Sequence, residues 1–414
     1  MSPIGPERVA SIMLSWHSLE LVSCKKIQTL WAGYGHICEI TARASNDTAA
    51  AELRRACHAE TTTDVFPLIL KLISPPPSRP GSEDEGHLRK MMSYEVEQYF
   101  YNSIAPCLEG DVSIANCIAT TRDKNGKPDA ELLDGFIATI MTDLRLRYPV
   151  AGEKRSELSE RQVLAALDWL SSFHRTSRKL IPEHSQEFLL PPLEEAKRRL
   201  SGDHTGTKLW LNGGYTYLAT RRKEYAALAA DSNSEWSAVL CKPTTTGGLS
   251  IAEMAANFLT PRGREHETLI HGDVKSENLF TTKSGSAVAF YDFQYVGLGL
   301  AVCDLAKLFT CSVPLDLLAD AVPDKLQMQK GERILLEYYR SKLMDASKQP
   351  NGIAVVYGWD DFVRHWETAL VDWLRFQASW GFWGNTEWLE ARVRSILNDN
   401  GWIDWLKKNQ NLDN

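Results

Sequence analysis

The hydrophobic positions in the first third of the chain fall into short runs separated by polar, proline or glycine residues. Residues 21–30 and 37–42 are apolar or alternating, and residues 65–73 (VFPLILKLI) are apolar except for one lysine. Runs of this length predict β-strands. Residues 87–104 instead repeat their apolar positions at helical spacing, which predicts a helix. A further apolar run, residues 136–144 (FIATIMTDL), predicts another strand, so a β-rich N-terminal lobe is expected.

The later part of the chain has amphipathic segments that predict helices, the strongest at residues 162–175. Eight of the 13 tryptophans lie within residues 359–405. Four of them recur every seven residues: Trp359, Trp366, Trp373 and Trp380. Seven residues return to within about 20° of the same side of a helix, so this spacing predicts one aromatic stripe. Such a stripe usually packs in the core, and an aromatic wall of a binding pocket is the alternative.

The strongest chemical signal lies in residues 269–280 (LIHGDVKSENLF) and 287–300 (AVAFYDFQYVGLGL). The first segment carries Asp273 and, five residues later, Asn278; the second carries Asp292 after an apolar run. Transfer of a γ-phosphoryl group needs a carboxylate that orients the attacking hydroxyl and accepts its proton, together with oxygen ligands for Mg²⁺. Asp273 fits the first role, and Asn278 and Asp292 fit the second. An ordinary turn explains His-Gly-Asp alone but not all three elements.

These residues resemble the signature of the aminoglycoside phosphotransferase and choline kinase-like superfamily, in which His-Gly-Asp is followed by Asn and later by a short motif opened by Asp. The Asp-Phe-Gln wording of residues 292–294 is most similar to the ecdysteroid kinase-like branch. The resemblance implies an α+β, bilobal protein-kinase-like fold. It implies a small antiparallel β-sheet lobe over residues 1–143 and a larger, mainly helical lobe over residues 144–414. It also implies a small-molecule kinase that uses ATP and Mg²⁺ to phosphorylate a hydroxyl group.

Candidate nucleotide-binding residues lie in the predicted N-terminal lobe. Gly33 and Gly35 separate the first two strands, where backbone N–H groups could approach phosphates without a Cβ atom in the way; a plain hairpin turn is the alternative. Lys71 is the lone charge in an apolar strand and needs a carboxylate partner. We expect that partner to be Glu97, with Glu95 as the rival on a different helix face. Kinase-like folds use such a pair to hold the ATP phosphates, and a snorkelling lysine is the alternative.

The resemblance assigns further residues. Backbone groups near Met141, Asp143 and Leu144 would hydrogen-bond the adenine of ATP. Asp304 resembles an acid that braces the catalytic loop, although an N-cap role explains it equally well. His174, at the end of a predicted helix, is interpreted as a structural hydrogen-bonding residue rather than a catalyst.

The acceptor pocket has no motif of its own. In this superfamily it is built from a helical insertion before the catalytic loop and from the C-terminal helices. Choline kinase-like members use an aromatic pocket, so Trp380 and Trp383 are candidates for contacting a cationic amine, with Asp372 as a counter-charge. The sequence leaves open amino alcohols, aminoglycosides, steroids and sugars as acceptors.

Protein kinases carry related motifs, and Lys275 occupies the position of their catalytic-loop lysine, which makes it a candidate catalytic residue. Here, however, 130 residues separate Asp143 from Asp273, a far longer interval than protein kinases have. No D-F-G or A-P-E sequence follows Gln294. A small-molecule kinase is therefore favoured over a protein kinase. A nucleotide-binding pseudokinase is a second alternative, and the intact lysine, aspartates and asparagine argue against it.

Composition limits the classes of protein to which the chain can belong. The chain has 414 residues, 43% of them hydrophobic, which suffices for a two-lobed enzyme. Its formal net charge is −7 and its basic residues form no blocks, so nothing favours nucleic-acid binding. We find no membrane-length apolar run and no signal-peptide pattern, and the eight cysteines lack zinc spacing. We expect a cytoplasmic protein with reduced thiols, and the oligomeric state stays open.

Overall fold

A computed structural model of the chain describes residues 4–58, 64–75, 84–109, 112–182, 185–202, 208–345 and 356–410. The described residues form two compact units. The first unit takes its residues from 1–107, 114–147 and 206–208. The second unit takes its residues from 108–113, 148–205 and 209–414.

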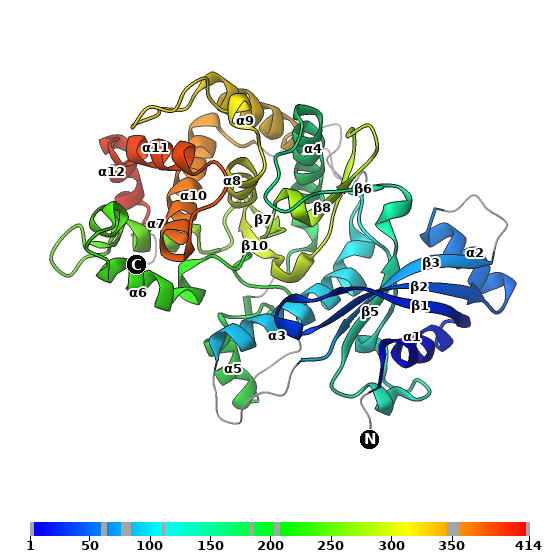
Figure 1. Cartoon of the computed structure of the whole chain (residues 1–414). Coiled ribbons are helices and arrows are strands. Elements are labelled where there is room, and N and C mark those ends of the chain that lie inside the picture. The colour runs from blue at the N-terminus through cyan, green and yellow to red at the C-terminus, as the bar shows by residue number, and fades with distance from the viewer. Residues whose placement is uncertain are drawn as a thin grey trace. The chain divides into compact units, whose positions relative to one another are not determined.

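The first unit is built on a five-stranded antiparallel sheet (Figure 1). In spatial order its strands are β1 (Leu19–Thr29), β2 (Gly35–Ala44), β3 (Val65–Ile73), β5 (Ile137–Thr142) and β4 (Cys117–Thr120). Each run predicted as a strand therefore forms one. Along β3, alternate residues from Phe66 to Leu72 are buried, which is the period of two that places one strand face in a core.

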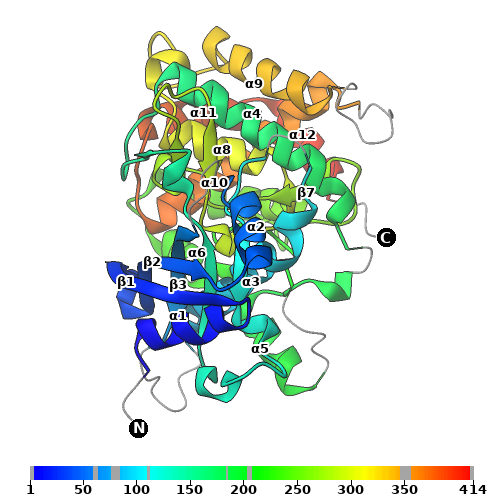
Figure 2. The same cartoon turned by 90° about the vertical axis from the view of Figure 1, so that its right-hand side faces the viewer.

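The helices of the first unit are α1 (Pro6–Ser15), α2 (Asp47–Ala56) and α3 (Glu85–Tyr99). α1 inserts Val9 and Met13 into the core that also holds Ile40 and Leu68, and it lies against β1 (Figure 2). α3 packs against β5 and runs directly into a π-helical turn at Phe100–Ile104. The helix predicted over residues 87–104 is therefore confirmed.

The second unit is mainly helical. Its helices are α4 (Glu160–Ser177), α5 (Pro192–Leu200), α6 (Arg222–Ala230), α7 (Ile251–Leu259), α8 (Val302–Cys311), α9 (Lys330–Leu343), α10 (Trp359–Trp380), α11 (Thr386–Leu397) and α12 (Asn400–Lys408). Its strands are β6 (Val150–Ala151), β7 (Glu267–Ile270), β8 (Leu279–Thr281), β9 (Val288–Phe290) and β10 (Gly297–Leu300). β7 pairs with β10, and β6, β8 and β9 form a second small sheet. The expected α+β class is therefore confirmed.

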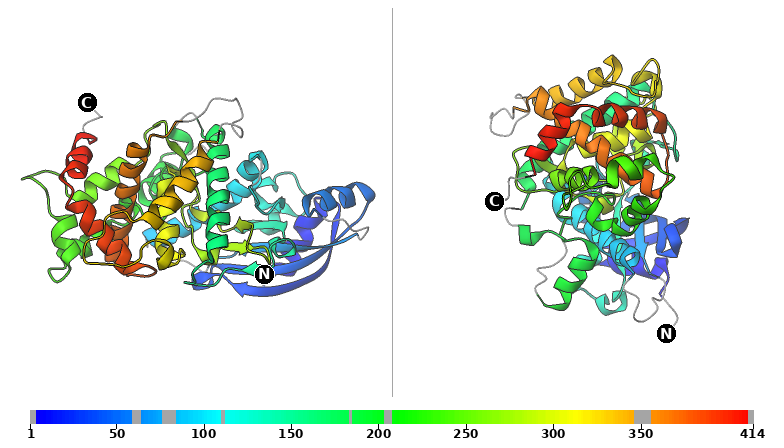
Figure 3. Two further views of the ribbon diagram at one scale, coloured as in Figure 1. Left: turned by 90° about the horizontal axis from the view of Figure 1, so that it is seen from above. Right: turned by 90° about the vertical axis from the view of Figure 1, so that its left-hand side faces the viewer.

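Helices α4 and α9 lie side by side in this unit (Figure 3). α4 begins with a capping box in which Ser159 and Gln162 satisfy each other's backbone N–H groups. The Tyr338 hydroxyl on α9 donates to Asp168 Oδ1 on α4 at 2.8 Å. The amphipathic helix predicted at residues 162–175 is thus confirmed, and α9 covers part of it.

The tryptophans spaced by seven residues all lie on α10, as predicted. Trp366 and Trp373 are buried, whereas Trp380 is 56% exposed. The core interpretation of the stripe therefore holds for its two middle members, and the C-terminal end of α10 presents an aromatic ring to solvent.

All eight cysteines are free thiols. Among the residues that the structure describes, none of the helices is long and apolar enough to cross a membrane.

Candidate active site

The predicted catalytic loop follows β7 and ends in a 3₁₀ turn at Ser276–Asn278. Asn278 Nδ2 donates hydrogen bonds to the main-chain oxygen of Asp273 at 2.8 Å and to Asp273 Oδ2 at 2.9 Å. Lys275 Nζ lies 3.1 Å from the same Oδ2. The structure therefore brings these three predicted residues together, and two donors fix the orientation of the Asp273 carboxylate.

Lys275 lies between two carboxylates, 3.1 Å from Asp273 and 3.0 Å from Glu277. Burial opposes its charge, but the two carboxylates outweigh burial and raise the pKa of Lys275 above its ordinary value. Lys275 is therefore an ammonium ion beside Asp273, and it can stabilise negative charge that develops there.

The β8–β9 hairpin brings Asp292 to the same end as Asn278. Leu279 pairs with Phe290, and the Tyr291 N–H donates to the Asn278 main-chain oxygen at 3.0 Å. Asp292 follows at once, with a left-handed φ of 66° that is uncommon for a residue with a Cβ atom. Gln294 Nε2 donates to Asp292 Oδ1 at 2.6 Å and helps to orient the carboxylate.

The oxygen atoms of Asn278 and Asp292 fit Mg²⁺, which prefers oxygen ligands and is commonly held by one or two carboxylates plus substrate phosphates. The Asn278 nitrogen is engaged by Asp273, so the amide oxygen is the atom that could bind a cation. Within the described parts of the chain, no three His, Cys, Asp or Glu side chains gather closely enough to hold a metal ion. A Mg²⁺ ion at these two residues would therefore need the phosphates of ATP as further ligands.

Helix α8 clamps the peptide groups on both sides of Gly272. Asp304 accepts hydrogen bonds from the His271 N–H at 2.7 Å and the Gly272 N–H at 2.9 Å. Lys307, about one helical turn later, donates from Nζ to the Gly272 main-chain oxygen at 2.5 Å. Asp304 is therefore a brace of the catalytic loop. The N-cap alternative is wrong, because the N-cap of α8 is Ala301.

Only glycine fits at position 272. Its φ is +83°, and a Cβ atom would lie 2.4 Å from the Tyr295 main-chain oxygen and 2.7 Å from the Gly214 N atom. The catalytic loop is thus pressed against a segment near Gly214 that lies more than 50 residues earlier in the chain.

His174 contacts the same carboxylate of Asp304. Its Nε2 lies 3.1 Å from Asp304 Oδ2, and its Nδ1 lies 2.7 Å from the Tyr339 hydroxyl. Burial raises the pKa of Asp304, but hydrogen bonding and charge from His174, His271 and Lys307 prevail and hold it below its ordinary value. The structural role predicted for His174 is therefore confirmed.

Replacing Asp304 by Asn is expected to loosen the catalytic loop. An amide cannot accept from both loop N–H groups without turning its own NH₂ toward a donor, so the free energy of unfolding should fall by about 3 kcal/mol. Turnover should fall with little change in the KM for ATP. Urea denaturation and steady-state kinetics measure both effects. Asp316→Asn, at an exposed acid, is the control; equal effects in the two variants would contradict the clamp.

His271 joins the catalytic loop to the hairpin. Its Nδ1 accepts from the Asp273 N–H at 3.2 Å, and its Nε2 lies 3.0 Å from the Tyr291 main-chain oxygen, which makes Nε2 the protonated nitrogen. Burial lowers the pKa of His271, so the ring is neutral. His271 therefore positions Asp273 and the residue before Asp292 rather than transferring a proton.

In the first unit, the predicted ion pair is present. Lys71 Nζ on β3 lies 2.5 Å from Glu97 Oε2 on α3, and both side chains are largely buried. The Lys71 ammonium also lies 5.7 Å from the centre of the Tyr94 ring. Glu97, rather than its rival Glu95, is therefore the carboxylate that pairs with Lys71. That this pair binds the phosphates of ATP stays a prediction.

Replacing Glu97 by Gln is expected to raise the KM for ATP and to lower kcat, since a misplaced lysine can cost about 10²-fold in rate. Adding Glu97→Gln to Lys71→Met should cost little more, because residues that act as a unit are strongly non-additive. Steady-state kinetics on the four proteins of this cycle measure the coupling. Glu95→Gln is the control; additive losses, or a larger effect from Glu95→Gln, would show that Glu97 does not act through Lys71.

The glycines predicted to approach phosphates lie in the β1–β2 turn. The Gly33 N–H donates to the Leu30 main-chain oxygen at 3.0 Å. A Cβ atom at Gly35 would lie 2.0 Å from the Leu72 main-chain oxygen. The close packing of β2 on β3 is therefore a sufficient reason for Gly35, and phosphate contact by either glycine stays a prediction.

The residues predicted near the adenine end the strand β5. Met141 is paired on both sides, with Ile69 of β3 and Cys117 of β4. The Asp143 side chain caps the turn that begins at Leu144, accepting from the Arg145 N–H at 2.9 Å, and forms an ion pair with the Arg145 guanidinium. The Asp143 carboxylate is thus engaged within its own turn, and contact of the backbone groups with adenine stays a prediction.

The predicted acceptor residues divide into two places. Trp380 and Trp383 both pack on Phe376, with ring centres 6.1 and 6.0 Å from it. Asp372 instead accepts two hydrogen bonds from the buried Arg375 guanidinium, at 3.0 and 2.7 Å. It lines a separate cavity of about 30 Å³ with Lys307, among other residues. The two tryptophans therefore belong to one aromatic cluster, whereas Asp372 is ion-paired with Arg375.

The charge of Asp273 acts on Cys311 and on Tyr215, whose ring centre lies 5.6 Å from that of Phe376. Burial, reinforced by the Asp273 charge, raises the pKa of Tyr215 well above its ordinary value. Burial also raises the pKa of Cys311 to about 12, with a hydrogen bond from Trp383 opposing this and the charge of Asp273 adding to it. Tyr215 and Cys311 are therefore two residues near the predicted site that the sequence pattern did not indicate.

Arg221 lies among the aromatic residues around Phe376, and the sequence did not indicate it as a site residue. Its guanidinium lies 4.9 Å from the Trp380 ring, 5.5 Å from Phe376 and 5.6 Å from Tyr215. It also donates to the Tyr215 main-chain oxygen at 2.7 Å. The only sequence signal near it is the glycine pair within LNGGYTY, residues 211–217, which contacts the catalytic loop.

A braced His-Gly-Asp loop and a hairpin carrying Asp292 are features of the aminoglycoside phosphotransferase and choline kinase-like superfamily of small-molecule phosphotransferases. The sequence model of the ecdysteroid kinase-like family matches residues 53–349. The chain therefore belongs to the ecdysteroid kinase-like family, and the resemblance stated from its motifs is confirmed. A comparison with curated protein sequences finds no significant match.

Solved structures similar to this chain include three small-molecule kinases. A choline kinase from Cryptosporidium parvum has 12% identity and a TM-score of 0.41, covering 95% of this chain and 90% of its own. An ethanolamine kinase from Plasmodium vivax has 10% identity and a TM-score of 0.40, covering 94% and 84%. A macrolide 2′-phosphotransferase from Brachybacterium faecium has 10% identity and a TM-score of 0.39, covering 99% and 98%.

Proposed function

We propose that this protein transfers the γ-phosphoryl group of ATP to a hydroxyl group of a small molecule. The observation that carries the proposal is the Asp273 carboxylate, which is oriented by Asn278 and Lys275. The loop that bears it is held by hydrogen bonds to Asp304 and Lys307 of α8. Phosphoryl transfer depends on positioning and on charge stabilisation more than on covalent help from the protein. A fixed carboxylate beside a permanent ammonium ion suits both requirements.

In the proposed reaction, Asp273 orients the acceptor hydroxyl and takes its proton as the hydroxyl oxygen bonds to the γ-phosphorus. The bond from that phosphorus to the oxygen bridging to the β-phosphate breaks, and ADP leaves with the bonding electrons. Lys275 contributes positive charge near the reacting oxygen, and Lys71 is proposed to bind phosphates. Mg²⁺, held by Asn278 and Asp292, would supply charge neutralisation on the phosphate oxygens.

The acceptor is proposed to be an uncharged alcohol with an apolar body. The aromatic box formed by Tyr215, Phe376 and Trp380 already contains a cation, the Arg221 guanidinium. The Glu224 carboxylate, 3.1 Å from Arg221 Nη1, offsets part of that charge, but a second cation brought to the same rings would still find the guanidinium in place of an open aromatic face. Of the acceptors that the sequence leaves open, steroids fit this surface better than amino alcohols or aminoglycosides. The exposed rings of Trp380 and Phe382 offer the apolar contact.

A matched pair of acceptors tests this proposal. A steroid alcohol should be phosphorylated with a kcat/KM at least about tenfold higher than the same steroid carrying an added amine, a difference of about 1.4 kcal/mol. ADP release with purified protein, ATP and Mg²⁺ measures both rates. Faster turnover of the amine would contradict the uncharged acceptor. ATP binding without ADP release with any alcohol would contradict phosphotransfer itself and favour a nucleotide-binding pseudokinase.

A further inference from the structure

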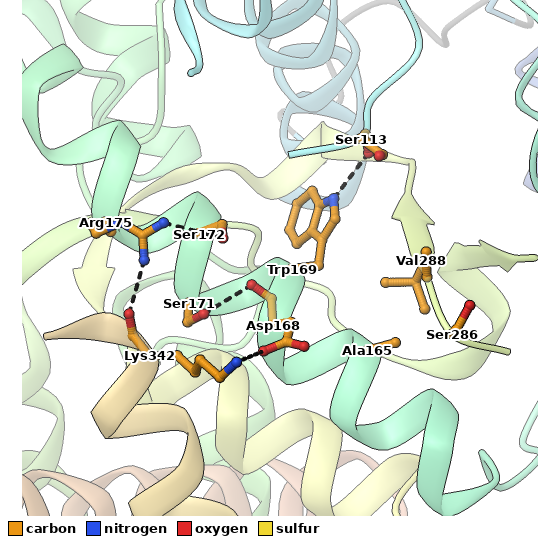
Figure 4. A pocket seen from close by; sticks show the side chains of 11 residues that line it. Ser113, Ala165, Asp168, Trp169, Ser171, Ser172, Arg175, Ser286, Val288 and Lys342 are labelled. Carbon is orange, nitrogen blue, oxygen red and sulfur yellow. Dashed lines mark hydrogen bonds and ion pairs between the residues drawn. The ribbon is translucent and has the colours of Figure 1, made fainter. Parts of the chain in front are cut away.

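A cavity of about 220 Å³ lies beside α4 in the second unit, and Figure 4 shows that its polar side chains bind one another or the main chain. Lys342 Nζ lies 3.4 Å from Asp168 Oδ1, and Arg175 Nη1 donates to the Lys342 main-chain oxygen at 2.9 Å. The Trp169 indole N–H donates to the Ser113 main-chain oxygen at 3.0 Å. These groups have partners within the protein, so the cavity by itself does not indicate a ligand.

The contacts that the proposed function leaves unexplained lie in the first unit, around the loop of residues 30–34 that joins β1 to β2. This loop contains Gly33, one of the two glycines predicted to approach phosphates. Lys90 Nζ on α3 lies 4.3 Å from the centre of the Trp31 ring and 4.1 Å from the centre of the Tyr34 ring. Burial lowers the pKa of Lys90 and the charge of Asp84 opposes that shift, while the two rings favour the ammonium form. One lysine of α3 therefore contacts two rings of the loop.

A hydrogen bond joins the same loop to the same helix. The Tyr34 hydroxyl lies 2.6 Å from His87 Nδ1. Burial, with the charge of Asp84 adding to it, raises the pKa of Tyr34, so the phenol keeps its proton and can donate it to the imidazole. The Tyr34 main-chain oxygen accepts from the Ser74 N–H at 2.9 Å. The last residue of the loop is thus fixed both to α3 and to the end of β3.

The backbone of the loop has a conformation that needs such contacts. Ala32 has a φ of 55° and Gly33 a φ of 74°, so two consecutive residues are left-handed. A residue with a Cβ atom adopts this region at a cost, and it stays there only where the surroundings fix it. Trp31 and Tyr34, the residues on either side of this pair, are the ones that contact α3.

One face of α3 carries four residues at intervals of three or four: His87, Lys90, Tyr94 and Glu97. Glu97, at the far end of this face, pairs with Lys71. Tyr94 lies between the two groups of contacts, with its ring centre 6.3 Å from that of Tyr34 and 5.7 Å from Lys71 Nζ. The loop and the ion pair that are predicted to bind the ATP phosphates therefore rest on one face of a single helix.

We propose that Lys90 and His87 are positioning residues for ATP, which hold the β1–β2 loop and the Lys71–Glu97 pair as one phosphate-binding unit. This inference rests on the proposed function. Neither residue would touch the nucleotide; each would act through the loop. A loop that is not held reaches its binding conformation for only part of the time, and the apparent affinity for ATP falls by that fraction. Adenosine has no phosphates, so its affinity should not depend on these contacts.

Calorimetry on the full chain, with ATP plus Mg²⁺ and with adenosine, tests the role of Lys90. Lys90→Met keeps the apolar stem and removes the charge. It should raise the Kd for ATP about tenfold, or about 1.4 kcal/mol, the scale of two partly exposed cation–π contacts, and leave the Kd for adenosine within about twofold. Lys90→Arg keeps a cation for the rings and should restore the Kd for ATP to within about threefold of the wild type. Lys25→Met, the same charge change at an exposed residue of β1, should leave both values within about twofold.

Two double-mutant cycles test the rest of the proposal. His87→Phe and Tyr34→Phe remove the same hydrogen bond, so each should raise the Kd for ATP about threefold and the double variant no further. Lys90→Met combined with Glu97→Gln should cost less than the product of the two single losses, because both act through one face of α3.

The outcomes separate this inference from the proposed function. If the wild type binds ATP and Lys90→Met binds it equally well, or loses adenosine to the same extent, Lys90 does not position the phosphates, and the proposed phosphotransfer stands. Fully multiplicative losses in the cycle with Glu97 would show that the loop and the ion pair act separately, which also overturns the proposal. No binding of ATP by the wild type would contradict the proposed function and this inference with it.

Discussion

Replacing Asp273 by Asn is expected to lower kcat by about 10² to 10⁴-fold, the range typical of general-base and positioning groups. The amide keeps the shape of the carboxylate, but it cannot take the proton of the acceptor hydroxyl. The affinity for ATP should be nearly unchanged, because the carboxylate acts on the acceptor rather than on the nucleotide. Steady-state turnover and nucleotide titration measure the two quantities separately.

Glu277→Gln is the matched control for that variant. Glu277 is the other carboxylate beside Lys275, at 3.0 Å, so its removal alters the same lysine without touching Asp273. We expect a loss of less than about tenfold, the scale of a partly exposed charge pair. If Asp273→Asn kept more than about a tenth of the wild-type turnover, Asp273 would not be the proton acceptor.

Replacing Asp292 by Asn should abolish most of the Mg²⁺-dependent binding of ATP. Asn suits this test better than Ala, because Asp292 has a φ of 66°, and Asn adopts the left-handed region more readily than Ala. Loss of a charged metal ligand should cost more than the roughly 10- to 100-fold typical of residues that only support a ligand. Thermal shift by ATP, with and without Mg²⁺, measures the effect.

Gln294→Ala supplies the comparison for Asp292. Gln294 donates to Asp292 Oδ1 at 2.6 Å and so supports the carboxylate without being a predicted ligand. It should weaken Mg²⁺-dependent protection by about tenfold, less than Asp292→Asn. If ATP with Mg²⁺ protected Asp292→Asn as well as it protects the wild type, Asp292 would not be the metal ligand.

The parts of the site that could be predicted from the sequence are formed by residues that lie close together in the chain. Asp273 and Asn278 lie five residues apart, so the motif itself specifies that they meet. Lys71 was predictable for a different reason, since a lone charge in an apolar strand is costly unless it is paired. The helix predicted over residues 87–104 offered Glu97 as that partner, with Glu95 on a different face as the rival, and the ion pair at 2.5 Å confirms Glu97.

The parts that were not predictable depend on contacts between distant segments. Arg221 lies 159 residues before Trp380 in the sequence, and nothing in either segment indicates that the guanidinium enters the aromatic box. In the sequence, Lys307 is one charged residue on an amphipathic helix. In the structure, its ammonium group donates a hydrogen bond to the Gly272 main-chain oxygen. Tertiary packing decides such pairings, and pattern and spacing carry little information about them.

The most direct test of the central claim is to follow the γ-phosphate itself. Purified protein, Mg²⁺ and ATP labelled with ¹⁸O in the γ-phosphate would be incubated with a library of steroid and other alcohols, and the products analysed by mass spectrometry. The account predicts that at least one alcohol gains a single labelled phosphate, in step with ADP, and that Asp273→Asn forms none above background. Labelled inorganic phosphate alone, or no transfer to any alcohol by a protein that binds ATP, would contradict it.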